Sequence, residues 1–160
     1  VTIAYMQPEN RQTADDWKRW VDVANRLGEA CRTNGLRAAY HNHDFEFKEI
    51  DGVVPFELLL AETDSDLIDF EVDFYWVAEA GLSIRDVLAK APQRMVLSHI
   101  KDRHVDGRMV DVGDGTIDFE GILADPVAAS IRHCFVEHDI PGDAFQSVAA
   151  SHQVLREILQ

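Results

Sequence analysis

The chain has 160 residues, a length that fits one ordinary domain with its own core. Its composition, 46% hydrophobic and 28% charged, is typical of a soluble globular protein, and its formal net charge is -14. A field of this sign repels phosphate backbones and anionic lipid, so we expect neither a nucleic-acid nor a membrane partner. No apolar run approaches the roughly 18 residues that a membrane-spanning helix needs.

The two cysteines indicate the compartment. Cys31 and Cys134 lie in apolar surroundings and form no C-x-x-C motif, so we expect two buried thiols in a reducing cytoplasm. The chain opens on "VTIAYMQP", without an initiator Met and without a signal-peptide pattern. We therefore expect a cytoplasmic protein with sequence missing upstream.

The first third of the chain predicts a strand, a helix and a second strand. Residues 1–6 form a short apolar run that Pro8 ends. Thr13 and Asp16 resemble a capping box at a helix start. The helix that follows ends at Asn34-Gly35, and its apolar positions recur at spacings of three and four: Trp17, Trp20, Val21, Ala24, Leu27 and Cys31. Residues 36–41 are the next expected strand.

The alternation continues to the end of the chain. We expect helices over residues 56–61, 83–91, 119–123 and 144–159, and strands over residues 67–72, 95–100 and 132–136. Ser83 and Asp143 are the expected caps of two of these helices, and the apolar face of the last one includes Phe145, Val148 and Leu155. Five strand-then-helix units predict an α/β fold with a parallel sheet, as one domain over 1–160. No G-x-G-x-x-G follows a strand, so a dinucleotide site has no support.

Ligand-type side chains stand at the ends of four of the five expected strands: His41 with His43, then Asp73, His99 and Glu137. The carboxyl ends of parallel strands meet at one face, where (β/α) barrels build their active sites. Two imidazoles and two carboxylates suit Mn²⁺, Zn²⁺, Fe²⁺ or Co²⁺ better than Ca²⁺. Taken singly, each residue also has a structural interpretation. His41 fits a buried core histidine and Asp73 a helix cap. Their coincidence favours a shared site.

The motifs together resemble a known family. "YHNHDFEF", "EVDFYWV", "SHIKD", "VGDGTIDF" and "FVEHD" are similar to the xylose isomerase-like TIM barrels, the sugar phosphate isomerase/epimerase group, whose relatives include D-tagatose 3-epimerase, hydroxypyruvate isomerase, inosose dehydratase and endonuclease IV. The resemblance covers essentially the whole chain. It implies a (β/α) barrel of which this sequence supplies only the C-terminal five units. A missing N-terminal part or a second copy of the chain would then complete it.

The resemblance also implies a metal site. In the epimerases Glu, Asp, His and Glu from successive strands hold a divalent ion. By motif, Asp73, His99 and Glu137 match the last three, and His41 stands where the first Glu is expected. We therefore expect Mn²⁺ at these four residues, with Zn²⁺, Co²⁺, Fe²⁺ and Mg²⁺ as alternatives.

The implied activity is isomerisation or epimerisation of a sugar, keto sugar or cyclitol, by proton abstraction next to a metal-polarised carbonyl. His41 in the first position removes a symmetric pair of glutamates, which leaves Glu137 as the expected base and His43 or Glu46 as its partner. A one-sided base also suits a dehydratase or lyase acting on a keto sugar or inosose. A non-catalytic metal- or sugar-binding fragment is a third alternative. A nuclease like endonuclease IV is disfavoured by the charge of -14.

Further residues near the strand ends are candidates for substrate binding. Lys101, two residues past His99, is expected to hold a substrate oxygen, with a salt bridge to Asp73 or Asp102 as the alternative. Trp76 is a candidate stacking platform for a sugar ring, with simple packing as the alternative. His43 and Glu46 are also expected to contact substrate. Glu71 is expected in a buried ion pair, and "GDG" over residues 113–115 in a tight turn.

Overall fold

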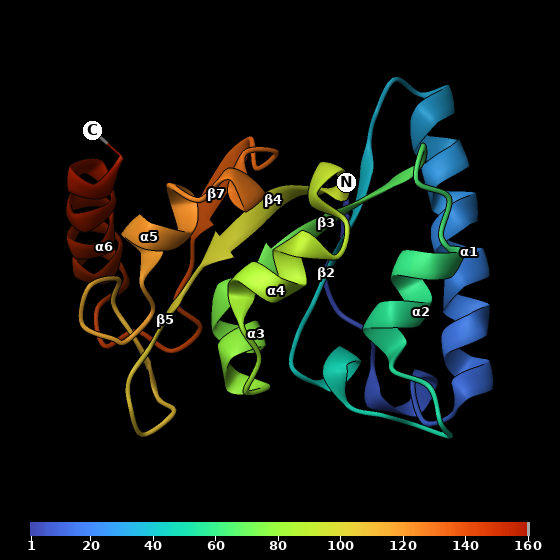
Figure 1. Cartoon of the computed structure of the whole chain (residues 1–160), viewed down its shortest axis with the longest axis horizontal. Coiled ribbons are helices and arrows are strands. Elements are labelled where there is room, and N and C mark those ends of the chain that lie inside the picture. The colour runs from blue at the N-terminus through green and yellow to red at the C-terminus, as the bar shows by residue number, and fades with distance from the viewer. Residues whose placement is uncertain (160) are drawn as a thin grey trace. The chain divides into compact units, whose positions relative to one another are not determined.

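The computed structural model describes residues 1–159, and the chain divides into two compact units, Val1–Glu71 and Val72–Gln160. We refer to them as unit 1 and unit 2. Five strands, β1, β2, β3, β4 and β7, run parallel to their neighbours, and helices connect them (Figure 1). The predicted α/β class is confirmed.

Unit 1 contains three parallel strands in the order β1-β2-β3. Ile3 pairs with Tyr40, and His41 at the end of β2 pairs with Glu71. The bounds are β1 Thr2–Ile3, α1 Ala14–Thr33, β2 Ala38–His41, α2 Pro55–Glu62 and β3 Ile68–Asp73, with short 3₁₀ turns at Pro8–Asn10 and Phe45–Phe47. Strand β3 continues into the first residues of unit 2.

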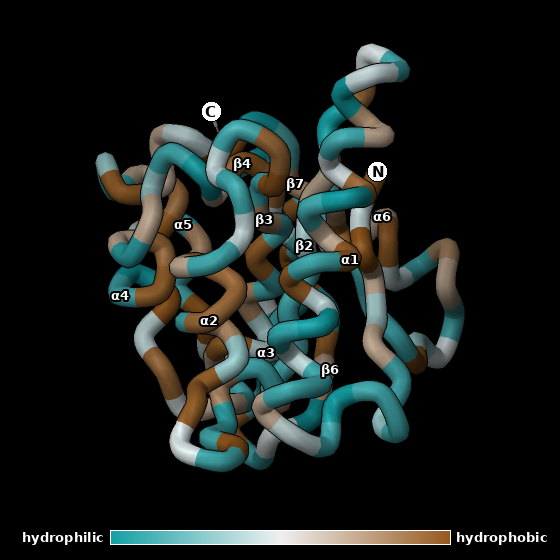
Figure 2. Tube along the Cα trace, turned by 90° about the vertical axis from the view of Figure 1, so that its right-hand side faces the viewer, coloured by the Kyte–Doolittle hydropathy of each residue, from teal (hydrophilic) through white to brown (hydrophobic). Residues whose placement is uncertain are grey.

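Helix α1 begins and packs as its sequence predicts. Thr13 and Asp16 form the expected capping box, which satisfies backbone N–H groups that have no partner inside the helix. Its buried residues include Trp17 and Val21, and Figure 2 shows hydrophilic and hydrophobic segments alternating along the helix. Gly28 lets α1 approach β3, because a Cβ there would lie 2.7 Å from Cβ of Leu67.

Unit 2 contains the parallel pair β4 and β7, in which Ile100 is paired with Val136, and a small antiparallel hairpin of β5 and β6. The bounds are α3 Phe74–Glu79, α4 Ile84–Ala89, β4 Met95–Ile100, β5 Asp102–Arg103, β6 Met109–Val110, α5 Phe119–Leu123, β7 His133–Val136 and α6 Ala144–Ile158, with 3₁₀ turns at Pro92–Arg94 and Pro126–Ala128. The expected caps Ser83 and Asp143 are confirmed.

Two elements of unit 2 were not predicted as such. Helix α3 begins directly after β3, where Asp73 accepts a hydrogen bond from the backbone of Trp76. The β5–β6 hairpin occupies part of the expected loop. Of the two cysteines, Cys31 is buried as expected, whereas Cys134 is half-buried; neither forms a disulfide.

The last helix buries only part of its apolar face within the described residues. Leu155 is buried, but Phe145 is 91% exposed and Val148 54%. On β7 the side chain of Phe135 is 47% exposed, and Ile140 just beyond the strand is 87% exposed. We call these four exposed side chains the apolar face of unit 2. Among the described residues, no helix combines the length and apolar character needed to cross a bilayer.

Candidate metal centre

Three of the predicted ligands meet within unit 2. Asp73 is the last residue of β3, His99 is the second-last residue of β4, and Glu137 directly follows β7. Nδ1 of His99 lies 2.5 Å from Oε2 of Glu137 and 3.8 Å from Oδ2 of Asp73. Three strand ends far apart in sequence therefore bring an imidazole and two carboxylates together.

Asp73 is fully buried and has two roles. Its Oδ1 accepts a hydrogen bond of 3.0 Å from the backbone N–H of Trp76, which caps α3, and its Oδ2 faces His99 and Lys101. Asp73 therefore caps a helix with one oxygen and belongs to the cluster of charged side chains with the other. Burial raises the pKa of Asp73 to about 6, against the opposing effect of Lys101.

Lys101 places an ammonium group among three carboxylates. Its side chain is only 3% exposed, and Nζ lies 2.7 Å from Glu137, 3.0 Å from Asp139 and 3.2 Å from Asp73. Burial alone would lower the pKa of this lysine, but the carboxylates outweigh that effect and raise it. The predicted alternative of a salt bridge to Asp73 is confirmed, and the group is a permanent cation.

Asp139 is a member of this cluster that sequence reasoning missed. A signal was present in its spacing, because Asp139 follows Glu137 by two residues as Lys101 follows His99. In extended chain, residues two apart point the same way. Its backbone N–H also contacts the sulfur of Met109 on β6, at 3.2 Å.

Glu137 and Asp139 are the most exposed members of the cluster. The side chain of Glu137 is 43% exposed. Partial burial opposes ionisation, but Lys101 and His99 outweigh it and lower the pKa of Glu137, so it is a carboxylate near neutral pH. Trp76 is half-buried, with its ring centre 5.8 Å from Nζ of Lys101.

The remaining predicted ligand, His41, lies in unit 1. It is buried at the end of β2, and its Nδ1 is 3.7 Å from Oε2 of Glu71. His41 is thus the partner of Glu71 in the expected buried pair. His43 contacts His41 edge to face, with ring centres 4.9 Å apart, and stacks on Phe45.

Glu46 is fully buried in unit 1. Oε1 accepts a hydrogen bond of 2.8 Å from the hydroxyl of Tyr40, and Oε2 accepts one of 2.7 Å from the backbone N–H of His43. Burial raises the pKa of Glu46 to about 7, although both bonds oppose the shift. Its carboxylate therefore holds the turn that carries His43, and its expected contact with substrate stays a prediction.

A second buried carboxylate in unit 2 organises the loop over residues 113–117. Asp102 accepts hydrogen bonds from the backbone N–H groups of Gly113 and Gly115, both at 3.0 Å, and of Ile117 at 3.2 Å. The expected tight turn is present. The same N–H groups are taken up by Asp102, which leaves them no part in binding phosphate. Sequence reasoning gave Asp102 no such role.

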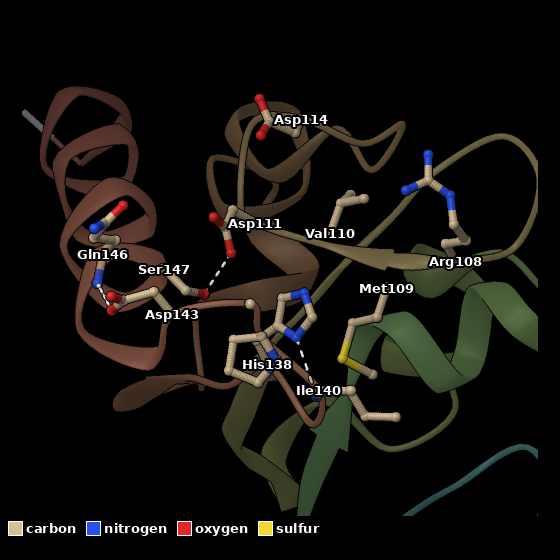
Figure 3. A pocket seen from close by; sticks show the side chains of 12 residues that line it. Arg108, Met109, Val110, Asp111, Asp114, His138, Ile140, Asp143, Gln146 and Ser147 are labelled. Atoms are coloured by element: carbon tan, nitrogen blue, oxygen red, sulfur yellow. Dashed lines mark hydrogen bonds between the residues drawn. The ribbon is translucent and has the colours of Figure 1, made fainter.

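A pocket of about 420 Å³ lies beside the cluster in unit 2 (Figure 3). The segment after β7 borders both sites, because Glu137 and Asp139 bond Lys101 whereas His138 and Ile140 line the pocket. The walls of the pocket are mainly polar and consist of Arg108, Met109, Val110, Asp111, Asp114, His138, Ile140, Pro141, Gly142, Asp143, Gln146 and Ser147. Carboxylate, amide, imidazole and hydroxyl groups of this kind are suited to hydrogen-bonding the hydroxyls of a sugar.

Comparison with known proteins identifies the family of the chain. The family model described as "Xylose isomerase-like TIM barrel" matches residues 2–151. Inosose dehydratase of Geobacillus thermodenitrificans (strain NG80-2) is 25% identical over 167 residues, which cover 91% of this chain and 55% of that protein. The crystal structure of a sugar phosphate isomerase/epimerase from Parabacteroides distasonis ATCC 8503 is similar with a TM-score of 0.84, at 27% identity over 97% of this chain and 56% of the other.

A third similar structure is the IOLI protein with a bound zinc atom, with a TM-score of 0.68 and 17% identity over 99% of this chain and 59% of that one. At this identity the similarity concerns the fold alone. The chain thus spans little more than half the length of the relatives it matches.

Proposed function

Because the chain belongs to the xylose isomerase-like TIM barrel family, we propose that it carries the metal-binding part of an isomerase or epimerase. Its substrate would be a sugar, a keto sugar or a cyclitol. The observation that carries this proposal is the meeting of Asp73, His99 and Glu137 at three strand ends of unit 2. The sugar phosphate isomerase/epimerase of similar fold supports the reaction class.

The residues present fit a divalent ion. One imidazole and two carboxylates are the mixed nitrogen and oxygen ligands that Mn²⁺, Fe²⁺, Co²⁺ and Zn²⁺ accept. The proposed ligands within unit 2 are Asp73, His99 and Glu137, the expected role of His41 as the fourth stays a prediction, and Mn²⁺ is the proposed metal. His41 is paired with Glu71, two residues before Asp73 on the same strand. When bound, the ion would polarise a substrate carbonyl.

The side chains of unit 2 supply the other parts of the chemistry. Glu137 is ionised and partly exposed, so it is the proposed acceptor of the proton on the carbon next to the carbonyl. Lys101 donates hydrogen bonds to a substrate oxygen, and the ring of Trp76 packs against the apolar face of a sugar. The expected role of His43, in unit 1, as a second proton-transfer group stays a prediction.

Elimination of water from an inosose or keto sugar is the second candidate function. The similarity to inosose dehydratase favours it, and a single exposed glutamate suits a reaction that needs a proton removed from one face only. A non-catalytic metal- or sugar-binding barrel fragment is the third. The two cysteines that form no disulfide fit a reducing compartment, so we propose a cytoplasmic location.

One experiment separates these candidates. The chain is incubated in D₂O with Mn²⁺ and a panel of ketoses and inososes, and the sugars are followed by NMR. Isomerisation or epimerisation gives deuterium at the carbon next to the carbonyl and a new stereoisomer or constitutional isomer. Dehydration gives an unsaturated or deoxy ketone instead. Activity that survives Glu137→Gln would rule out this glutamate as the base, and no exchange with any sugar would favour the non-catalytic candidate.

A further proposal concerns the partner of the apolar face of unit 2. Because the similar structures are nearly twice as long, we propose that Phe135, Ile140, Phe145 and Val148 pack against the remaining (β/α) units of a barrel. Fusing the chain to such units from a similar protein should bury these side chains and raise the melting temperature. A stable homodimer of the 160-residue chain would instead identify a second copy as the partner.

A further inference from the structure

The ammonium group of Lys101 lies where a divalent ion needs negative charge. It bonds two of the proposed ligands, Glu137 at 2.7 Å and Asp73 at 3.2 Å. A metal ion at these carboxylates would place its own charge beside a buried cation, and like charges at short range in a buried site repel strongly. Metal binding at this site therefore requires Lys101 to give up these two bonds.

Asp139 is the one carboxylate of the cluster that is not a proposed ligand. It bonds Nζ of Lys101 at 3.0 Å, and its side chain is 40% exposed. The ammonium can therefore withdraw from Asp73 and Glu137 without forming any new ion pair, because its bond to Asp139 already exists. A buried ammonium that left its two partners with no third carboxylate nearby would instead be costly.

Asp139 is also anchored for this task. Its backbone N–H contacts Met109 on the β5–β6 hairpin, and the neighbouring residue His138 lines the pocket in Figure 3. The backbone of Asp139 is thus held next to the hairpin and to a residue of the pocket wall. From this geometry we propose that Asp139 is a positioning residue that holds Lys101 off Asp73 and Glu137 when a divalent ion binds. The inference rests on the proposed metal site.

Titration of Mn²⁺ into the metal-free chain by calorimetry tests this directly. Asp139→Asn should weaken Mn²⁺ binding about tenfold, a size typical of the coupling between groups in one ionic network. Asp139→Glu should restore most of the affinity. Asp114→Asn is the matched control, since it removes the same charge from an exposed residue of the same unit and should change the affinity less than about twofold.

The double variant shows whether Asp139 acts through Lys101. In a Lys101→Met background there is no ammonium to hold, so adding Asp139→Asn should leave the Mn²⁺ affinity unchanged. Circular dichroism of each variant verifies its fold, and the comparison of Asp139→Asn with Asp139→Glu stands even if Lys101→Met does not fold.

The outcomes distinguish this inference from the proposed function. Equal losses for Asp139→Asn and Asp114→Asn would reduce the effect to overall charge and overturn the inference alone. So would a loss that persists in the Lys101→Met background. If no form of the chain binds Mn²⁺, the proposed metal site falls and the role of Asp139 falls with it.

Discussion

Two fully buried carboxylates, Glu46 in unit 1 and Asp73 in unit 2, are stabilised in opposite ways. Glu46 receives its hydrogen bonds from a hydroxyl and a backbone N–H, both neutral donors. Asp73 also accepts one backbone hydrogen bond, but its other oxygen faces an ammonium and an imidazole. Burial raises the pKa of both, to about 7 for Glu46 and about 6 for Asp73.

This difference in hydrogen-bonding and charged partners indicates that Glu46 is a structural acid and that Asp73 belongs to a candidate site. Neutral donors hold the carboxylate of Glu46, and the charge of Arg11 is the smallest of the effects on its pKa. Charged neighbours at Asp73 bring further acids with them, Glu137 and Asp139, and some of these reach solvent. The proposed metal site therefore lies at Asp73 and not at Glu46. Three predictions test this contrast, and a fourth concerns the apolar face of unit 2.

The largest expected effect is on metal binding. His99→Ala removes the only imidazole of the unit 2 cluster and should lower Mn²⁺ affinity by at least about 100-fold, since changes even beyond the direct ligands commonly cost 10- to 100-fold. Metal content after dialysis, measured by mass spectrometry, gives the result. His133→Ala, an exposed histidine of β7, is the control. Equal metal retention by both variants would remove His99 from the site.

Loss of the internal cation should be the largest effect on stability. Lys101→Met leaves Asp73 buried without its ammonium, and removal of one partner of a buried pair costs about 4 kcal/mol in the free energy of unfolding. The deficit should narrow below about pH 6, because Asp73 is then protonated in both proteins. Denaturant unfolding at pH 5 and pH 7.5 measures it.

The control for this prediction is a surface pair. Lys48→Met in unit 1 breaks a salt bridge to Asp44 in which the lysine is 66% exposed, and such pairs contribute less than about 1 kcal/mol. A deficit for Lys101→Met as small as that of Lys48→Met, or one that does not depend on pH, would mean that Asp73 does not depend on the ammonium.

The sequence was sufficient for the fold and for the convergence of Asp73, His99 and Glu137. Helix caps such as Thr13 are local, and the carboxyl ends of parallel strands meet whatever lies between them, so both could be predicted from position alone. The resemblance supplied the expectation of a partial barrel, and the family match bears it out.

What escaped prediction depends on distances between segments. Lys101 had two alternatives that spacing cannot separate, a substrate contact or a salt bridge, because only folding shows that its ammonium reaches three carboxylates. The hydrogen bond from the hydroxyl of Tyr40 to Glu46 escaped prediction for the same reason, because it joins two segments whose distance the sequence does not show. The sequence offers Asp102 only as a salt-bridge partner of Lys101, because nothing in its spacing shows that the loop over residues 113–117 closes around it.

A smaller effect is expected at the buried acid of unit 1. The pKa of Glu46 rises from its ordinary value of 4.5 to about 7 on folding, so its stabilising contribution is complete below about pH 4.5 and is lost as the pH rises to 7. Glu46→Gln keeps the shape and an acceptor without this loss. Between these pH values it should therefore gain roughly 3 kcal/mol in the free energy of unfolding over the wild type, since a shift of one pKa unit corresponds to about 1.4 kcal/mol.

Urea unfolding across this pH range measures the difference, with Glu49→Gln, an exposed acid of the same segment, as the control. A gain by Glu46→Gln that is the same at pH 4.5 and pH 7 would show that the carboxylate is not the titrating group. A loss at every pH would mean that the amide of Gln cannot replace the carboxyl oxygen that accepts the hydrogen bond from the backbone N–H of His43.

The smallest effect is expected on the apolar face of unit 2. Phe145 is 91% exposed on α6, so Phe145→Ser should change the free energy of unfolding of the chain by less than about 0.5 kcal/mol. Leu155→Ala, on the same helix at 6% exposure, should cost about 2 kcal/mol or more.

The cost of Phe145→Ser relative to that of Leu155→Ala should rise if the apolar face of unit 2 is covered. In a chain completed by further (β/α) units, Phe145→Ser should approach the cost of Leu155→Ala, because the phenyl ring would then be removed from a packed interface. A Phe145→Ser cost that stays near zero in the completed protein would show that this face of unit 2 is open to solvent and needs no partner.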